Sequence, residues 1–600
     1  MDSNSTHNMK TRGSKQRASV ACVSSACVRV SPARSSRTCR SYDDPLVANM
    51  ATIAPSSVPQ SVDQARASPE SAGYMAATTA EILSIKSMGV YHTPTVPIKD
   101  IPRHLIIPSK MVYDKVFNAD GTFKKYKARL CARGDRWQDI YGTETYAGTV
   151  KSESVRFLLA IAAELDYEIE CVDVKTAFLH SALEPGEIIY LRRPKGLTDA
   201  DMPEIVQLDK CIYGLPKASA RFREHSDATL RGVGFTPLVS DPCVYKRIAN
   251  GTTVFAAVHV DDIGLIGSSK EAIAFVKQGL SRTYSLTEQL DMTYYLGLHI
   301  VRDRKAKTVT LLQDGYIDSL LEKYSKDVIT SVTFPTTPML AIPLSVTEDP
   351  DVTRLLSAAG VTEYQGIIGS LLYLASQTRP DILFAVCSLA RKAKAPCAAD
   401  RMAASRVLNY IAGTSRLGLV LHSGEGIRLY ATVDASYACH PDLKSHTGCT
   451  LHIGRKSGSV NSLSKKQTIT ADSSTVTELI GAHFAAHEIM WARNFLSELG
   501  FAQQGPTTLF EDNMSTISLI VNKGNGQRTK HIDLRYNFVR EQVVENIIQM
   551  THLSGVDMTS DILTKALGPS SFLHLRPALL GMSARLLYHL EADIMKLSTA

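Results

Sequence analysis

The spacing of hydrophobic positions predicts helices and strands over most of the chain. In Ser152–Leu165 the apolar residues recur every three or four positions, which predicts an amphipathic helix. Thr475–Leu499 keeps the same spacing over a longer stretch. In Val254–Gly267 (VFAAVHVDDIGLIG) two apolar runs flank two aspartates, which predicts a β-hairpin with Asp261 and Asp262 at the turn. Helical spacing and strand-like apolar runs both occur throughout the chain, so we expect a multidomain α/β and α+β protein.

The two ends of the chain lack this periodicity. Residues 1–80 are rich in Ser, Ala, Thr and Arg, a composition that predicts a disordered leader, and we expect residues 571–600 to be a C-terminal tail. Arg- and Ser-rich, acid-poor N-termini also resemble mitochondrial transit peptides, and that alternative stays open. The remaining length is too great for one hydrophobic core, so several domains are expected.

Charge and cysteine content narrow the class of protein. Residues 1–42 contain eight basic residues and one acidic residue, which accounts for the whole net charge of +7. The rest of the chain is balanced, so any nucleic-acid binding there must use local basic grooves and metal ions. The 11 cysteines form no CxxC pair, which argues against a zinc ribbon and favours a reducing compartment. No apolar run is long enough to cross a membrane, so a soluble protein is expected.

The aspartates of the hairpin are the first candidate site. Two carboxylates at the tip of an apolar hairpin repel each other unless a cation or a proton lies between them. An ordinary Asp-containing β-turn is the alternative. The segment Glu168–Asp173 (EIECVD) predicts a short strand that also ends on an aspartate. If Asp173 meets the pair, the three carboxylates suit Mg²⁺, and two such ions could hold the attacking and leaving oxygens of a phosphoryl transfer.

A second candidate is the basic hairpin of Lys110–Arg136, whose turn falls at Asn118–Gly121. Its second strand is crowded with positive charge at Lys124, Lys125, Lys127, Arg129 and Arg133. The strand is either a solvated sheet edge or a surface that contacts phosphates, and its own sequence does not decide between them.

The C-terminal third contains four acids at predicted strand ends and helix starts: Asp434, Glu478, Asp512 and Asp561. Each has an ordinary explanation when taken alone. Thr475-x-x-Glu478 matches a capping box, Asp561 is favoured at a helix start by the helix dipole, and the other two are common turn residues. The recurrence of acids at such positions makes a joint site the stronger interpretation.

Several sequence blocks resemble one known family. VDVKTAF (Val172–Phe178), IYGLPKASARF (Ile212–Phe222) and HVDDIGLIG (His259–Gly267) resemble the reverse transcriptase of copia-type LTR retrotransposons. Further matching blocks lie at Tyr126–Gly134, Tyr294–Arg302, Tyr364–Val386 and Val407–Thr414. Ser464–Leu479 and Arg528–Glu541 resemble that family's version of the ribonuclease H fold. Many blocks in the family's order make the resemblance specific over roughly residues 85–570.

The resemblance implies a right-hand polymerase with fingers, palm and thumb over residues 81–330, a connection over 331–425 and an RNase H-like domain over 426–570. It implies an RNA-directed DNA polymerase that extends a primer and a ribonuclease H that hydrolyses RNA in an RNA–DNA hybrid. The implied partners are an RNA template, a DNA primer, the hybrid and deoxynucleoside triphosphates, with no membrane. It says nothing about the oligomeric state, and it suggests a cytoplasmic virus-like particle or the nucleus as location.

The resemblance also assigns residues. Asp173 and Asp261 are the implied metal ligands of the polymerase, with Asp262 beside them, and the quartet Asp434, Glu478, Asp512 and Asp561 is the implied ligand set of the ribonuclease H. Each site is expected to hold two Mg²⁺ ions, with Mn²⁺ as a substitute. Lys127 and Arg129 lie where such enzymes contact the incoming triphosphate. Phe178 matches an aromatic position that excludes a ribose 2′-hydroxyl, although core packing would also explain it. His531 is expected to be structural or to assist product release.

Three positions depart from the family pattern. His259 replaces a tyrosine, Lys217 replaces a glutamine that normally faces template and nucleotide, and Phe222 replaces a tryptophan. None of them removes a metal ligand. They motivate an alternative hypothesis, a decayed or co-opted remnant that binds nucleic acid without catalysis. Because no integrase or zinc-binding module is present in the sequence, we expect a fragment, a processed product or a truncated copy of a polyprotein.

Overall fold

The computed structural model describes residues 58–117, 123–136, 145–289, 291–328, 333–340, 354–422, 424–522 and 533–583. All of these belong to one compact unit of the chain. The predicted turn at Asn118–Gly121 and His531 lie outside the described residues. Among the described helices, none has the length and apolar character that a membrane span requires.

The N-terminal subdomain combines two helices with a five-stranded sheet. The helices are α2 (Val62–Ala67) and α3 (Ser71–Ser87), and α3 packs on β3. The expected disordered leader is therefore wrong for residues 58–80, because Tyr74 and Thr78 of α3 are buried in this core. The strand order is β1 (Tyr91–His92), β6 (Ile205–Leu208), β5 (Tyr190–Arg192), β2 (Ile106–Phe117) and β3 (Phe123–Ala132). Strands β2 and β3 form the predicted basic hairpin.

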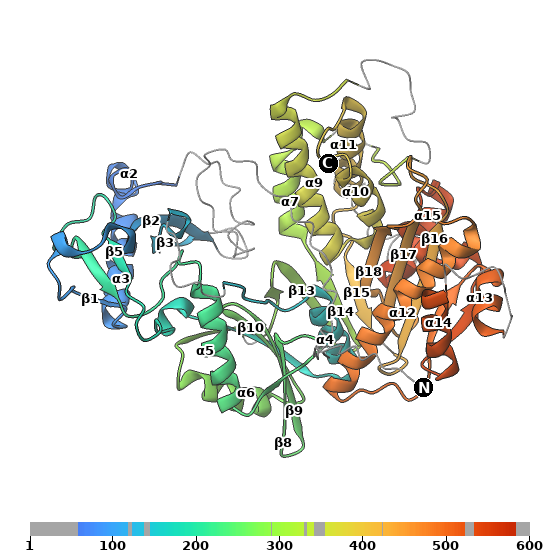
Figure 1. Cartoon of the computed structure of the whole chain (residues 1–600), viewed down its shortest axis with the longest axis horizontal. Coiled ribbons are helices and arrows are strands. Elements are labelled where there is room, and N and C mark those ends of the chain that lie inside the picture. The colour runs from blue at the N-terminus through green and yellow to red at the C-terminus, as the bar shows by residue number, and fades with distance from the viewer. Residues whose placement is uncertain are drawn as a thin grey trace, which may run out of the picture. The chain divides into compact units, whose positions relative to one another are not determined.

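The central sheet has the order β11, β4, β10, β9, β8, β7. Figure 1 labels its strands β8, β9 and β10. Its strands are β4 (Glu168–Val174), β7 (Thr236–Pro237), β8 (Val244–Ala249), β9 (Thr252–His259), β10 (Asp262–Gly267) and β11 (Leu286–Gln289). The helices of this region are α4 (Ser152–Leu165), α5 (Ala218–Gly232) and α6 (Lys270–Ser281). Helix α4 has the predicted bounds, and the predicted hairpin is β9–β10.

The next region is a four-stranded sheet joined to a group of helices. Strands β12 (Tyr294–Tyr295), β13 (Leu298–Asp303), β14 (Thr308–Leu312) and β15 (Leu419–His422) follow one another across the sheet. Helices α7 (Asp314–Lys323), α9 (Ala358–Gln377), α10 (Leu383–Ala390) and α11 (Ala398–Ala412) share one hydrophobic core. That core also contains a fully buried ion pair, in which the Arg379 guanidinium lies 2.8 Å from the Asp381 carboxylate.

The C-terminal domain is built on a sheet with the order β18, β17, β16, β19, β20. Strands β16 (Leu429–Ser436), β17 (His446–Ile453) and β18 (Ser459–Lys466) are antiparallel neighbours, and β19 (Thr507–Glu511) and β20 (Ile548–His552) continue the sheet in parallel. Helix α12 (Ser474–Leu499) packs on β16 and β17 (Figure 1). Three helices complete the domain: α13 (Met514–Val521), α14 (Asp533–Val544) and α15 (Pro569–Leu580). This is an RNase H-like topology.

Helix α15 corrects the expected C-terminal tail. Phe572, Leu575 and Leu579 of this helix are buried in the same core as the α9–α11 helices. Burial of such side chains stabilises the fold by about 1.5–3 kcal/mol each. The ordered chain therefore continues past residue 570.

Glu488, on the buried side of α12, predicts how stability depends on pH. Burial, together with the negative charge of Glu153, raises the pKa of Glu488 to about 7. A glutamate in an unfolded chain has a pKa of about 4.3. At a pH between the unfolded and the folded pKa, Glu488 keeps its proton in the folded protein but has lost it in the unfolded chain. The stability from this proton is complete below the unfolded pKa and is lost as pH rises towards 7. We therefore expect the midpoint temperature of thermal unfolding, measured in saturating Mg²⁺, to fall as the pH is raised from about 5 to about 8. The fall should be larger in the wild type than in Glu488→Gln. Equal pH profiles would contradict this.

Candidate active sites

The hairpin β9–β10 carries the first group of acids. Its two-residue loop is Val260 and Asp261, while Asp262 is the first residue of β10 and not a turn residue as predicted. Val260 has a φ of 55°. A β-branched side chain is strained in this left-handed region, and such strain is found mostly at functional sites.

Strand register brings Asp173 to the same end of the sheet. Strand β10 lies between β4 and β9, and Asp262 pairs directly with Asp173 on one side and with His259 on the other. Residues directly opposite in an antiparallel pair have Cβ atoms about 4.5–5.5 Å apart on one face of the sheet. Asp173, Asp261, Asp262 and His259 are all half-buried. The predicted association of Asp173 with the hairpin aspartates is thus present in the fold.

The basic strand β3 lies within electrostatic reach of these acids. Burial raises the pKa of Asp173, and the positive charges of Lys127 and Arg129 act against that rise. Burial and the charge of Arg129 lower the pKa of Lys127, while Asp173 and Asp261 counteract this effect. The Arg129 guanidinium also lies 5.3 Å from the centre of the Tyr213 ring. Lys127 and Arg129 of β3 are therefore close enough to Asp173 for their charges to act on it.

Phe178 lies close to the same site, on the short 3-10 turn Ala177–His180 that follows β4. Its half-buried ring makes edge contacts with Tyr213 and Phe222, with ring centres 5.2 Å and 6.2 Å away. These contacts hold the ring in one orientation. They agree with core packing, and they also leave part of the ring exposed.

Lys217 does not lie where its predicted role requires. Its side chain is 1% exposed, and its ammonium pairs with the carboxylate of Glu187, which is 4% exposed. A buried ammonium with a buried partner has no surface with which to contact a template or nucleotide. The predicted direct contact is therefore corrected to an internal ion pair at the start of α5.

This pair predicts a stability effect. Lys217→Met leaves the Glu187 carboxylate buried without its partner, so we expect a loss of about 3–5 kcal/mol in the free energy of unfolding. The double variant Lys217→Met/Glu187→Met is expected to recover most of that loss, because neither charge then remains. Denaturant unfolding of the three proteins measures this. Wild-type stability combined with weakened template affinity in Lys217→Met would instead support the contact role.

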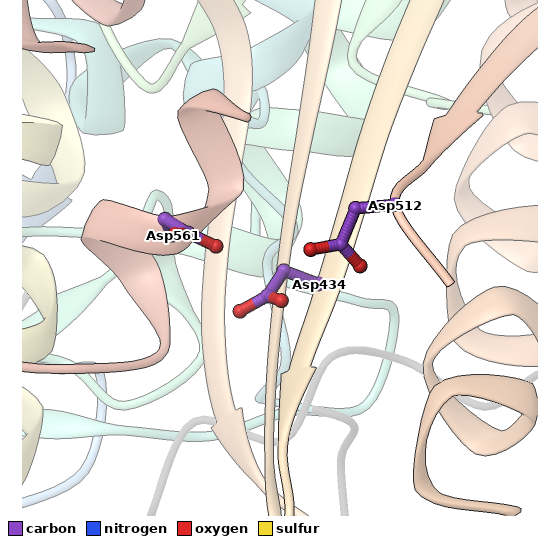
Figure 2. Close-up of side chains that lie close together, drawn as sticks. All are labelled: Asp434, Asp512 and Asp561. Atoms are coloured by element: carbon purple, nitrogen blue, oxygen red, sulfur yellow. The ribbon is translucent and has the colours of Figure 1, made fainter. Parts of the chain in front are cut away.

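The second site lies in the C-terminal domain. Asp434 comes from β16, Asp512 follows β19, and Asp561 lies on the 3-10 turn Thr559–Leu563. Figure 2 shows the three carboxylates converging. One carboxylate oxygen from each lies within 4.8 Å of the others. Adjacent parallel strands place Asp434 and Asp512 side by side, as their predicted strand-end positions implied.

Glu478 joins this site through a second group. Oxygens of Glu478, Glu511 and Asp512 also lie within 4.8 Å of one another. The capping-box explanation of Glu478 is wrong, because α12 is capped by Ser473, whose hydroxyl accepts a hydrogen bond from the Val476 amide. Glu478 instead lies one turn after the first residue of α12, where its side chain is buried. All four predicted acids therefore meet, with Asp512 common to both groups.

The charges show that this site suits a cation. Burial, together with the charge of Asp434, raises the pKa of Asp561 to about 7 and also raises the pKa of Asp512. The Lys565 ammonium lies 2.9 Å from Asp561 and 3.7 Å from Asp434, so it occupies a cationic position between two carboxylates. Carboxylate oxygens are the ligands that Mg²⁺ prefers. The residues present fit a divalent hard metal. Within the described residues the hairpin acids form no equally compact group.

Glu511 is the site residue that the sequence interpretation missed. It is 0% exposed, one of its oxygens accepts a hydrogen bond from the Asn513 amide, and the other has no hydrogen-bond partner. Burial and the neighbouring acids raise the pKa of Glu511 and of Glu478. Strand alternation could have found Glu511, because it lies two residues after buried Leu509 and so faces the same side. Lys565, four residues after Asp561, was also missed.

Glu511→Gln tests whether this carboxylate supports metal binding. Removing its charge weakens the attraction for a divalent ion, and loss of a supporting group at a metal site typically costs about 10–100-fold in affinity. We therefore expect Mn²⁺ to bind that much more weakly, measured by calorimetry. Glu545→Gln, an exposed glutamate of the same domain, is the control. If Glu511→Gln binds Mn²⁺ as tightly as the wild type, Glu511 does not support metal binding and has only a structural role at the start of α13.

One family model and one solved structure are similar to parts of this chain. The family described as reverse transcriptase (RNA-dependent DNA polymerase) matches residues 95–341. A foamy viral protease–reverse transcriptase, solved in complex with an RNA/DNA hybrid, has a TM-score of 0.42 at 13% identity, covering 80% of this chain and 54% of that one. That score is low, and the fold assignment rests on the strand orders given above.

Curated relatives extend over more of the chain. The Retrovirus-related Pol polyprotein from transposon TNT 1-94 of Nicotiana tabacum is 32% identical over 533 residues, which is 87% of this chain and 39% of that protein. The one from transposon RE1 of Arabidopsis thaliana is 32% identical over 78% of this chain and 31% of its own length. A putative transposon Ty5-1 protein of Saccharomyces cerevisiae is 32% identical, covering 46% of this chain and 87% of that protein. This chain spans under two fifths of the two plant polyproteins. It belongs to the copia-type LTR retrotransposon Pol family.

Proposed function

We propose that this chain is an RNA-directed DNA polymerase that also hydrolyses the RNA strand of RNA–DNA hybrids. The observation that carries the proposal is the presence of two separate carboxylate sites on two different sheets. One combines Asp173, Asp261 and Asp262 with the basic strand β3. The other combines Asp434, Glu478, Asp512 and Asp561 with Lys565.

In the polymerase site, Asp173 and Asp261 would hold Mg²⁺, and Asp262 adds negative charge beside them. A metal ion bound there would supply charge neutralisation for the phosphates and a lowered pKa for the primer 3′-hydroxyl. Lys127 and Arg129 bind the triphosphate of the incoming deoxynucleotide, since their charges already act on Asp173. Phe178, held by Tyr213 and Phe222, limits the space beside the sugar and so disfavours a 2′-hydroxyl.

In the ribonuclease H site, Asp434, Glu478, Asp512 and Asp561 would hold two divalent ions. Ions bound there would supply activation of the attacking water and stabilisation of the leaving 3′-oxygen. Thr564 orients Asp434 by donating its hydroxyl hydrogen to that carboxylate. Lys565 holds Asp434 and Asp561 together before metal binds. The partners of both sites are RNA template, DNA primer and the hybrid, which are recognised by backbone and shape.

The proposal is tested by primer extension and hybrid cleavage with one preparation. The full chain should extend oligo(dT) on poly(rA) in Mg²⁺ or Mn²⁺, and it should release fragments from labelled RNA in a hybrid. Chelation of the metal should stop both reactions. A folded chain that binds hybrid but does neither would contradict the proposal and support a remnant that only binds nucleic acid.

A further inference from the structure

Helix α12 carries two histidines outside both acid sites. His483 and His487 are one helical turn apart and therefore lie on the same side of the helix. Their Nε2 atoms are 3.3 Å apart. Glu478 lies five residues before His483 and faces the buried interior, whereas His487 is exposed. The histidine pair is thus separate from the acid sites and lies on the side of α12 that packs against α14.

The distance between the two nitrogens matches joint ligation of one metal ion. Histidine nitrogens bind Zn²⁺ at about 2.0–2.1 Å, so two of them on a tetrahedral ion lie about 3.3–3.4 Å apart. Without an ion, the same two nitrogens lie within hydrogen-bond distance of each other, so ligation would replace this contact. Two histidines at i and i+4 on a helix are also the spacing by which helical zinc sites present two ligands on one face.

The neighbouring helix holds both rings in place. The His487 ring stacks on Phe538 of α14, with ring centres 4.4 Å apart and an angle of 12° between planes. The His483 ring meets the same phenyl ring at 5.4 Å and 65°. One aromatic side chain thus orients both imidazoles, which reduces the entropy lost when they bind one ion.

The protonation state suits ligation. Burial lowers the pKa of His483 to about 4, with further contributions from His487 and Arg535, and burial lowers the pKa of His487. Neutral imidazole is the form that binds metal, so no proton must be displaced near pH 7. The positive charge of Arg535 opposes a cation, and its effect can be tested separately.

We propose that His483 and His487 form a two-histidine site for a late first-row divalent ion such as Zn²⁺, Co²⁺, Ni²⁺ or Cu²⁺, with water completing the coordination. Imidazole favours these ions over Mg²⁺, so the site is chemically distinct from the carboxylate sites. Metal bound there fastens one turn of α12 and thereby stabilises the helix that carries Glu478. The proposal does not depend on either catalytic activity.

The test is a calorimetric titration of the full chain with Ni²⁺. Excess Mg²⁺ occupies the carboxylates, and a Cys439→Ser background removes an exposed thiol. We expect one Ni²⁺ per chain, and we expect His483→Gln and His487→Gln each to weaken it by at least about tenfold, because the second ligand no longer acts at high effective concentration. His574→Gln, an exposed histidine on α15, is the matched control and should bind as the parent does. Arg535→Gln should bind more tightly.

Spectroscopy provides a readout independent of affinity. Cu²⁺ bound to the parent should show hyperfine coupling to two imidazole nitrogens, and each single variant should show one. His487 is exposed and His483 is half-buried, and circular dichroism checks that the variants fold. Equal Ni²⁺ affinity in the parent and the double variant, or independent binding by each single variant, would overturn the proposal.

Discussion

Asp261→Asn is expected to reduce primer extension by at least about 10³-fold, since loss of a metal-ligating carboxylate removes several kcal/mol of transition-state stabilisation. Asp261 lies in the two-residue loop of β9–β10, and its charge acts on Lys127. The substitution keeps the side-chain shape and removes only the charge. The measurement is single-turnover nucleotide addition on a primed RNA template.

The same preparation supplies the internal control. RNA hydrolysis should stay close to the wild-type rate, because the second acid site is built on a different sheet. Asp291→Asn, an exposed aspartate near β11, should extend primers normally. Extension by Asp261→Asn within tenfold of wild type would mean that the hairpin acids are not the polymerase site.

Asp434→Asn is expected to produce the complementary result. Asp434 is buried at the meeting point of Asp512, Asp561 and Lys565, so its loss should lower RNA hydrolysis by at least about 10³-fold and leave primer extension intact. The measurement is cleavage of labelled RNA in a preformed hybrid. Metal affinity should fall in parallel, measured with Mn²⁺.

Asp442→Asn is the matched control for this variant. Asp442 lies in the same domain, and its carboxylate forms a solvent-exposed ion pair with Lys466, so its substitution should change neither activity. Wild-type cleavage by Asp434→Asn would place the nuclease chemistry elsewhere. Loss of both activities in Asp434→Asn would show that the domain had unfolded.

Hydrophobic spacing predicted the elements well where the pattern was long. Helix α4 has the predicted bounds, and α12 begins one residue earlier than expected. The errors lie at helix starts that contain several serines. Ser473 caps α12, although Thr475 also matched the local cap pattern. A cap depends on which hydroxyl the backbone can reach, and spacing alone does not encode that geometry.

The acid sites could be predicted because each acid follows an apolar strand or begins a helix. The ion pairs between buried side chains could not be predicted. Lys217 meets Glu187 only because α5 packs near the N-terminal sheet, and neither residue carries a local signal of the other. Helices α3 and α15 were missed although their buried positions recur every three or four residues, because each adjoins a terminal stretch that lacks such periodicity.

The pairing of β14 with β15 has a consequence for how the chain can change. Thr308–Leu312 and Leu419–His422 are neighbouring strands of one sheet, although more than 100 residues separate them. The segment that contains α7 and α9–α11 therefore leaves and re-enters the sheet at adjacent positions, as an insertion does. The entropy of closing such an excursion grows only slowly with its length. The two strands can therefore still find each other when the helical segment changes in length, provided that the core it shares with Phe572, Leu575 and Leu579 of α15 is kept.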